Sequence, residues 1–427
     1  MMKTIIRGGR VIDPAQHLDS RFDVLIEDGL ICEIGERIEA EHAHEIDAAG
    51  LLVLPGLVDI HCHLRDPGFE YKEDIATGTR SAAAGGFTSV CCMPNTSPVN
   101  DCAAVSRYIL ERAQTVGCGV RVYPIGAISK GLKGAELAEI GTMKAAGIVA
   151  VSDDGRPVVN ANLMKLALIY ADHFDVPVVS HSEDLDLTDG GVMNEGYMST
   201  LLGLRGVTRA AEEVMIARDI RLAETYGKRI HLCHVSTRGG VQLVREAKAR
   251  GVRVTAETAP HYIAATDAWV EGYDTNTRVN PPLRTEEDRL AVIAGLADGT
   301  LDCIATDHAP HHADEKNVEY PLAASGIVGF ETAFAVCYTE LVLKGYMDVE
   351  RLVSLMAHRP AQILNLPAGT LAPGARADIA LVDIGETWTV EAAKLHSKSK
   401  NTPFDGRTYT GRVKRTLCGG RTIYEEA

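Results

Sequence analysis

The stretch Asp59-Ile60-His61-Cys62-His63-Leu64-Arg65 places two imidazoles two residues apart, directly after an apolar run at residues 51–60. Residues i and i+2 of a strand point to the same face of a sheet, so His61 and His63 can reach one metal ion together. Further His and Asp residues also end short apolar runs, namely Asp153, His181, His234 and Asp307. Strand ends that carry only these two residue types predict a metal centre.

Short apolar runs alternate with helical patterns through the middle of the chain. The predicted strands are 57–63, 88–94, 121–127, 148–153, 176–181, 229–234, 252–257 and 301–308, and helices are predicted at 75–84, 163–173, 210–226, 241–250 and 285–296. Eight strands that alternate with helices predict an α/β fold, a (β/α)8 TIM barrel. In such a barrel the chemistry lies at the C-terminal ends of the strands, and every candidate metal ligand is found there.

Both ends of the chain have a different, β-rich pattern. The N-terminal runs 5–12 and 23–34 are interrupted at Gly8-Gly9 and Asp28-Gly29, and the C-terminal runs 412–417 and 421–424 flank Gly419-Gly420. Such dipeptides are signals of hairpin turns. Because neither end is long enough to close a core comfortably alone, we predict one small discontinuous β-sandwich domain from residues 1–55 and 365–427, with the barrel at 56–364.

Composition limits the classes of function. The chain has 427 residues, 46% of them hydrophobic, and a formal net charge of −15. This acidic balance argues against a nucleic-acid partner or an anionic membrane surface. The sequence shows neither an apolar run of membrane-spanning length nor the pattern of a signal peptide, so a cytoplasmic location is expected. Ten scattered cysteines are expected to be buried thiols and not a disulfide framework.

The mixture of imidazole and carboxylate suits zinc or another divalent first-row ion. Six candidate ligands are more than one tetrahedral ion needs, so two Zn²⁺ ions are expected, bridged by an aspartate and a hydroxide. Strand alternation lets only one of the neighbours Asp153 and Asp154 face the metals, and we favour Asp153 as the bridge. The expected sets are His61, His63 and Asp307 on one ion and His181 and His234 on the other, and Asp307 is the candidate catalytic acid and base.

Two longer segments carry a family resemblance. Residues 59–68 and 305–311, the latter followed by Lys316, resemble the two signature segments of the dihydroorotases, which belong to the amidohydrolase superfamily. The resemblance implies a reversible interconversion of dihydroorotate and N-carbamoyl-L-aspartate in pyrimidine biosynthesis. Where many relatives have a carbamylated lysine after strand 4, this chain has Asp153, which is similar to the bridging aspartate of one dihydroorotase subgroup.

The substrate carries a carboxylate, so its enzyme needs a cation and hydrogen-bond donors beside the metals. Arg65, placed by strand alternation on the same face as His63, is the candidate cation. The resemblance implies further substrate contacts by His63, Asn95, Asn280, His311, Ser325 and Gly326.

Three alternatives stay open at this point. The chain could be a sister cyclic amidohydrolase, such as an allantoinase or a dihydropyrimidinase, because these share the barrel and the metals. It could be a catalytically silent barrel that assembles with aspartate transcarbamoylase, although such chains lose metal ligands. It could also bind metal for structural reasons alone. The resemblance further implies a possible homodimer and a possible complex of the active enzyme with aspartate transcarbamoylase.

Overall fold

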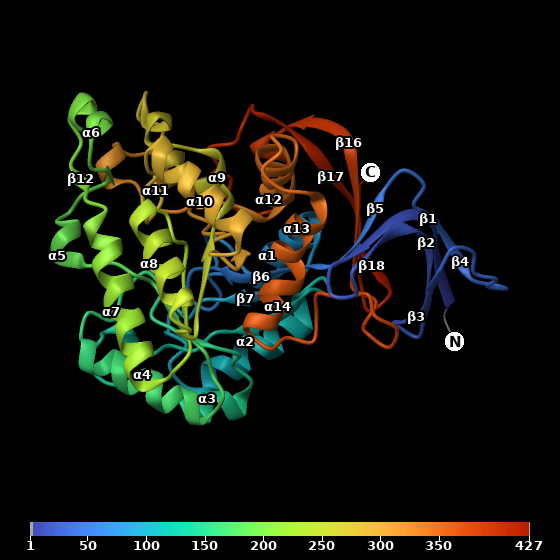
Figure 1. The fold of residues 1–427 in the computed structure, drawn as a ribbon, viewed down its shortest axis with the longest axis horizontal. Coiled ribbons are helices and arrows are strands. Elements are labelled where there is room, and N and C mark those ends of the chain that lie inside the picture. The colour runs from blue at the N-terminus through green and yellow to red at the C-terminus, as the bar shows by residue number, and fades with distance from the viewer. Residues whose placement is uncertain (1–2, 427) are drawn as a thin grey trace.

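The computed structural model describes residues 3–426 and contains the predicted barrel (Figure 1). Its parallel strands pair in two runs, β6-β7-β8 and β9-β10-β13-β14-β15, and the parallel bridges Gly126–Val151 and Cys62–His308 join the runs into a closed ring. All eight predicted strands are confirmed in position. Each is shorter than predicted, and β7 begins one residue earlier and β14 ends one residue later than the predicted bounds. The strands are β6 (Leu57–Cys62), β7 (Phe87–Cys92), β8 (Arg121–Pro124), β9 (Val151–Ser152), β10 (Val178–Ser180), β13 (Ile230–Leu232), β14 (Val254–Thr258) and β15 (Cys303–Ile304).

Helices cover the outside of this ring. Asp74 caps α1 by accepting a hydrogen bond from the backbone N–H of Thr77, and Gly227 ends α7 in the left-handed region, with a φ of 63°. The α-helices are α1 (Ile75–Ala84), α2 (Ala103–Val116), α3 (Ile140–Ala146), α4 (Ala161–His173), α5 (Leu185–Thr188), α6 (Tyr197–Leu202), α7 (Ala210–Tyr226), α8 (Arg238–Ala249), α9 (Pro260–Ala264), α10 (Glu286–Asp298), α11 (Ala313–Lys316), α12 (Phe330–Cys337), α13 (Val349–Val353) and α14 (Arg359–Ile363).

Shorter elements fill the connections. The 3-10 turns are η1 (Lys130–Leu132), η2 (Asp267–Val270), η3 (Thr275–Thr277), η4 (Tyr320–Leu322) and η7 (Ala392–Lys394), and the π-helical turns are η5 (Tyr338–Val342) and η6 (Ser354–His358). The strands β11 (Met193–Asn194) and β12 (Gly206–Val207) pair with each other beside the barrel.

Both ends of the chain contribute to one β domain, as predicted, and their strands pair as a single sheet where a β-sandwich was expected. In Figure 1 the blue N-terminal strands and the red C-terminal strands lie side by side, and their order is β18-β17-β16-β5-β1-β2-β3, with β4 also paired to β1. The buried side chains of this sheet come from both ends, for example Ile6 and Val24 with Ile379 and Leu417. The exact limits of the domains stay predictions. The strands are β1 (Lys3–Asp13), β2 (Leu18–Glu27), β3 (Leu30–Gly35), β4 (His44–Asp47), β5 (Leu52–Pro55), β16 (Ile379–Thr389), β17 (Thr408–Cys418) and β18 (Arg421–Glu425).

Only two of the three glycine-containing signals in this sheet are hairpin turns. Asp28-Gly29 joins β2 to β3 and Gly419-Gly420 joins β17 to β18, each as a two-residue loop. Gly8-Gly9 instead lies inside β1, where the register to β2 shifts between Ile6 and Gly9. Gly8, with a φ of 69°, provides the backbone conformation of a bulge, so the prediction of a turn there is wrong.

The described residues contain no helix with both the length and the apolar character needed to cross a membrane. All ten cysteines are free thiols, and most of them are buried, so the expectation of buried thiols without disulfides is confirmed for this part of the chain.

Candidate metal centre and active site

Four histidine side chains converge on Asp154 at the C-terminal end of the barrel. His61 and His63 come from the end of β6, His181 follows β10 and His234 follows β13. Measured to the nearest carboxylate oxygen of Asp154, the distances are 3.4 Å from His61 Nε2, 3.4 Å from His63 Nε2, 3.3 Å from His181 Nδ1 and 3.6 Å from His234 Nε2. The strand ends therefore bring together side chains that are far apart in the sequence.

Asp307 completes this group from the end of β15. Its Oδ1 lies 3.2 Å from His63 Nε2 and 3.5 Å from His61 Nε2, and the side chain of Asp307 is largely buried. Asp307 and His234 both adopt left-handed backbone conformations, with φ values of 47° and 34°. Non-glycine residues rarely adopt such conformations, and they concentrate at sites where the surrounding structure fixes a side chain for function.

The prediction that Asp153 faces the histidines is wrong. Its Oδ1 accepts hydrogen bonds from the backbone N–H groups of Ile128 (2.8 Å) and Ser129 (2.9 Å), and its Oδ2 accepts one from the Ser129 hydroxyl. The physical reason is the length of β9, which ends at Ser152, so the chain already turns at Asp153 and strand alternation no longer applies. Asp153 therefore anchors the loop after β8. Asp154 occupies the position among the histidines that was predicted for Asp153.

The electrostatics of the centre favour positive charge. Burial alone would raise the pKa of Asp154, but the surrounding His61, His181 and His234 outweigh it and hold that pKa well below its usual range. Burial also lowers the pKa of His181, yet hydrogen bonds to Asp154 and Glu183 outweigh it and raise the pKa to about 10. A metal cation at the centre would balance the negative charge of Asp154 and Glu183. Protons on the histidines would then no longer be needed for that balance.

The donor atoms also fit a divalent metal ion. His61 Nε2 and Asp154 Oδ1 are buried and have no hydrogen-bond partner among the described residues, although buried polar atoms are normally paired. Donor atoms of His61, His63 and Asp307 lie within 4.8 Å of one another, and so do those of His61, Asp154 and His234. Nitrogen and carboxylate oxygen donors at such spacing are typical ligands of zinc and related ions.

Two glutamates that the sequence interpretation missed orient these histidines. Glu257 accepts a hydrogen bond from His61 Nδ1 (2.6 Å), and Glu183 accepts one from His181 Nε2 (3.0 Å). Because an ionised carboxylate can only accept, the proton of the neutral, metal-binding form of each histidine would stay on the nitrogen that faces the glutamate. The other ring nitrogen, which is turned toward Asp154, would then be free to bind a metal ion. The position of Glu257 at the end of the predicted strand 252–257 was a signal for it, and Glu183 follows His181 with the same i+2 spacing as His63 follows His61.

Cys233 also lies in the group that contains His61, Asp154 and His234. Its thiol is buried, and burial raises its pKa. The thiol is therefore protonated at neutral pH and is a poorer metal ligand than the neighbouring imidazoles.

A cavity of about 320 Å³ opens on the metal centre. Its lining includes Asp154, His181, His234 and Asp307. All the residues that were predicted to contact the substrate line it as well: His63, Arg65, Asn95, Asn280, His311, Ser325 and Gly326.

The orientations of the two asparagines are fixed by the metal-centre residues. Asn95 Oδ1 accepts a hydrogen bond from His63 Nδ1 (2.9 Å), so the side chain can offer its NH2 group to the cavity. Asn280 Nδ2 donates to Glu183 Oε2 (3.1 Å), so Asn280 can offer its carbonyl oxygen. The cavity therefore has a donor on one side and an acceptor on the other.

Arg65 supplies positive charge to the cavity. Its Nε donates to Pro310 O (3.1 Å), and its Nη2 lies 3.3 Å from His311 Nε2. Burial and then the charge of Arg65 lower the pKa of His311 to about 3, so His311 is neutral near pH 7. No described carboxylate lies within salt-bridge distance of Arg65, which leaves its charge for an anionic ligand. Because β6 ends at Cys62 and the φ of Arg65 is 62°, a turn and not strand alternation places this side chain.

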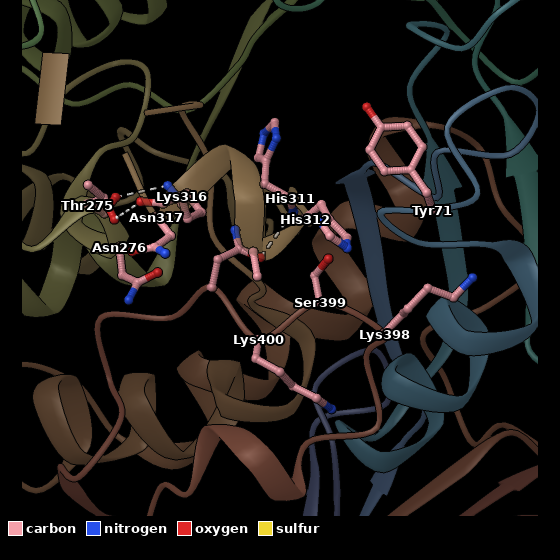
Figure 2. Close-up of a pocket in the computed structure, with 12 residues that line it drawn as sticks. Tyr71, Thr275, Asn276, His311, His312, Lys316, Asn317, Lys398, Ser399 and Lys400 are labelled. Carbon is pink, nitrogen blue, oxygen red and sulfur yellow. Dashed lines mark hydrogen bonds between the residues drawn. The ribbon is translucent and has the colours of Figure 1, made fainter. Parts of the chain in front are cut away.

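A second cavity of about 600 Å³ lies on the other side of His311 (Figure 2). Its lining comes from four parts of the chain, namely Tyr71, residues 275–276, residues 311–313 with 316–317, and residues 398–401 of the C-terminal segment. Lys316, at the end of α11, donates its ammonium hydrogens to the carbonyl oxygens of Thr275 (2.9 Å) and Ala324 (2.7 Å). The Lys316 side chain therefore joins two loops of the protein by its hydrogen bonds.

Structures with the same fold include cyclic amidohydrolases. The chain resembles the L-hydantoinase (dihydropyrimidinase) of Arthrobacter aurescens with a TM-score of 0.91 and 26% identity, over 100% of this chain and 97% of the other. A dihydropyrimidinase from Brevibacillus agri superposes with a TM-score of 0.87 at 24% identity, over 99% and 95% of the two chains, and supports the fold alone.

Sequence similarity is more specific. A family model described as "Dihydro-orotase-like" matches residues 50–240, and one described as "Amidohydrolase family" matches residues 227–424. The dihydroorotase of Acetivibrio thermocellus is 57% identical over 99% of both chains. The dihydroorotase of Citrifermentans bemidjiense is 56% identical over 99% of this chain and 100% of the other. The chain belongs to the dihydroorotase family, whose enzymes are hydrolases of cyclic amides.

Proposed function

We propose that this protein is a zinc-dependent dihydroorotase with two metal ions per chain, bridged by Asp154. The observation that carries the proposal is the convergence of four histidines on Asp154 at the floor of a cavity whose wall contains Arg65. Such a site suits a substrate that has both a cyclic amide and a carboxylate. The reaction is the reversible interconversion of dihydroorotate and N-carbamoyl-L-aspartate.

The proposed metal ligands are His61, His63 and Asp307 for one ion and His181 and His234 for the other. The metals would polarise the amide carbonyl and lower the pKa of the attacking water. Asp307 accepts the proton of that water and returns it to the ring nitrogen that leaves, and in the reverse direction it takes the proton from the nitrogen. Since neighbouring imidazoles hold the pKa of Asp307 low in spite of burial, its carboxylate is ionised and can act as the base.

The remaining residues of the cavity bind and orient the substrate. The guanidinium of Arg65 and the NH2 group of Asn95 bind the carboxylate, and neutral His311 helps to hold Arg65. Asn280 and the backbone groups of Ser325 and Gly326 contact the ring amide. Because these contacts surround the reacting carbonyl, they hold it in position for attack.

The decisive experiment compares substrates on zinc-reconstituted protein. We expect ring opening of L-dihydroorotate, with little turnover of dihydrouracil or allantoin, and about two metal ions per chain by elemental analysis. Preferential turnover of dihydrouracil or allantoin would make the protein a sister amidohydrolase. No turnover at full metal loading would support the silent assembly partner instead.

Replacing Arg65 by alanine tests the binding of the carboxylate. We expect KM for dihydroorotate to rise by about a hundred-fold, with a smaller change in kcat, because a buried charge pair is lost. Steady-state kinetics in both directions would separate the change in KM from the change in kcat. Residual turnover of dihydrouracil, which lacks the carboxylate, should change little. An unaltered KM for dihydroorotate would contradict the role of Arg65.

The assembly state and the location are further proposals that follow from the family. We propose a cytoplasmic enzyme that forms a homodimer and associates with aspartate transcarbamoylase, which acts before it in pyrimidine biosynthesis. Light scattering of the purified protein, alone and mixed with the transcarbamoylase, would test both contacts.

A further inference from the structure

A buried asparagine outside the barrel holds the two loops that line the substrate cavity. Asn401 Nδ2 donates to Ala309 O (3.2 Å) and Gly326 O (2.9 Å), and its Oδ1 accepts a hydrogen bond from His311 N (3.0 Å). Both amide hydrogens and the carbonyl oxygen are therefore used, and only 4% of the residue is exposed. One side chain thus bonds to both the His311 segment and the Ser325-Gly326 loop. The same segments are also joined directly, because Ala309 N donates to Ile327 O (2.7 Å) and His311 Nε2 donates to Ser325 O (2.9 Å).

Asn401 belongs to the C-terminal segment between η7 and β17, which is itself firmly attached. Ser399 Oγ donates to Lys72 O (2.6 Å), and Lys398 N donates to Glu73 Oε1 (3.2 Å). The backbone oxygen of Asn401 accepts a hydrogen bond from Val328 N (2.8 Å). The side chain of Asn401 therefore projects from a fixed backbone, and the segment that carries it also forms a wall of the second cavity in Figure 2.

The Ser325-Gly326 loop is held from its other side by the loop that precedes Asn280. Gly326 N donates to Arg278 O (2.9 Å), and the ammonium of Lys316 holds Ala324 O. The φ of Gly326 is 140°, and a Cβ there would lie 2.7 Å from Ala309 Cβ. Asn401 therefore sits where two closely packed backbones meet, and its loss would leave two buried carbonyl groups and one buried N–H without their partner.

We propose that Asn401 is a positioning residue for substrate binding, through which the C-terminal segment sets the place of Gly326 and His311. Asn401 does not itself line the cavity above the metal centre, so it acts through these two residues. The proposal deepens the proposed function and rests on it, because it assumes that Ser325, Gly326 and Arg65 with His311 meet the substrate. It predicts a defect in substrate binding with an intact metal centre.

The test compares Asn401→Ala with Ser399→Ala. Ser399 is a buried residue of the same segment, and its replacement also removes a side-chain hydrogen bond to a carbonyl oxygen. We expect KM for dihydroorotate to rise about tenfold in Asn401→Ala, with kcat changed by less than about threefold, and no comparable change in Ser399→Ala. Zinc content should equal that of the parent protein in both. If Asn401→Ala does not fold, Asn401→Ser serves instead, because its short hydroxyl leaves a polar group in the buried site but cannot make all three hydrogen bonds of the amide.

Hydrogen exchange separates failure of this proposal from failure of the proposed function. Peptides that cover residues 309–311 and 324–328 should exchange faster in the Asn401 variant than in Ser399→Ala, whatever the substrate of the enzyme is. Faster exchange together with the raised KM supports the proposal. Unchanged exchange, or faster exchange with an unchanged KM, overturns it. If the parent protein does not open the ring of dihydroorotate, the proposed function is refuted, and with it the role of Asn401 in substrate binding. The exchange data still report whether Asn401 holds the two loops.

Discussion

Replacing Asp307 by asparagine is expected to lower kcat for dihydroorotate by at least about a thousand-fold while the protein stays folded. Asp307 Oδ1 faces the Nε2 atoms of His61 and His63, and the left-handed backbone of Asp307 fixes it in that direction. Asparagine keeps the size of the side chain but cannot accept the proton of the attacking water at neutral pH. Turnover in both directions should fall together, because the same carboxylate serves as base in one direction and, once protonated, as acid in the other.

The control for this experiment is the metal itself. Asparagine is a weaker ligand, so zinc content must be measured on the same sample, and activity compared at full occupancy. A thermal unfolding curve close to that of the parent protein would exclude a folding defect. Substantial activity of Asp307→Asn at full metal loading would refute the proposed acid and base role, and would leave the proton transfer to another group in the cavity.

The positions of the site residues along the barrel could be predicted because the barrel imposes a simple rule. Each predicted ligand follows a short apolar run, and parallel strands in a closed ring deliver all their C-terminal ends to one place. His61, His63, His181, His234 and Asp307 reach the same centre for this reason. The prediction required only two facts about each strand, namely that it forms and at which residue it ends.

The sequence was less informative wherever the chain leaves the strand. The choice between Asp153 and Asp154 depended on alternation, which fails one residue after β9 ends. Gly8-Gly9 has the composition of a turn, but the flanking strand continues through it as a bulge. In both places the tertiary pairing of the backbone, which a local pattern does not contain, decides the outcome.

The contacts of the residues that support the ligands and the loops could not be predicted from local patterns. Glu183 and Glu257 contact histidines, and Asn401 contacts loops that lie at a distance in the sequence. The positions of Glu257 and Glu183 were compatible with a place near the ligands, but they do not say which imidazole each glutamate meets, and Asn401 has no distinctive position at all. Only the assembled structure shows these contacts. These residues nevertheless determine which ring nitrogen faces the metal centre and where the substrate loops lie.

The neighbours Asp153 and Asp154 allow a matched test of the bridging role. Asp154→Asn removes the carboxylate on which four histidines converge, and we expect it to bind less than about one zinc per chain and to lose at least about a thousand-fold in kcat/KM. The measurement is elemental analysis after dialysis against a weak chelator, followed by kinetics on the same sample. The charge of Asp154 is the reason for this expectation, because without it Asp307, whose carboxylate lies beside His61 and His63, is the one carboxylate left among the proposed ligands.

Asp153→Asn is the control, since it makes the same chemical change one residue away. Its side-chain oxygen can still accept the hydrogen bonds from Ile128 N and Ser129 N, and its NH2 group can donate to the Ser129 hydroxyl, so metal content and kcat should stay close to those of the parent protein. The reverse result, with metal lost in Asp153→Asn and kept in Asp154→Asn, would contradict the proposal. It would mean that in the metal-loaded enzyme Asp153, and not Asp154, faces the metals. Because both variants change one carboxylate to an amide in the same buried turn, any difference between them reports which side chain faces the metals.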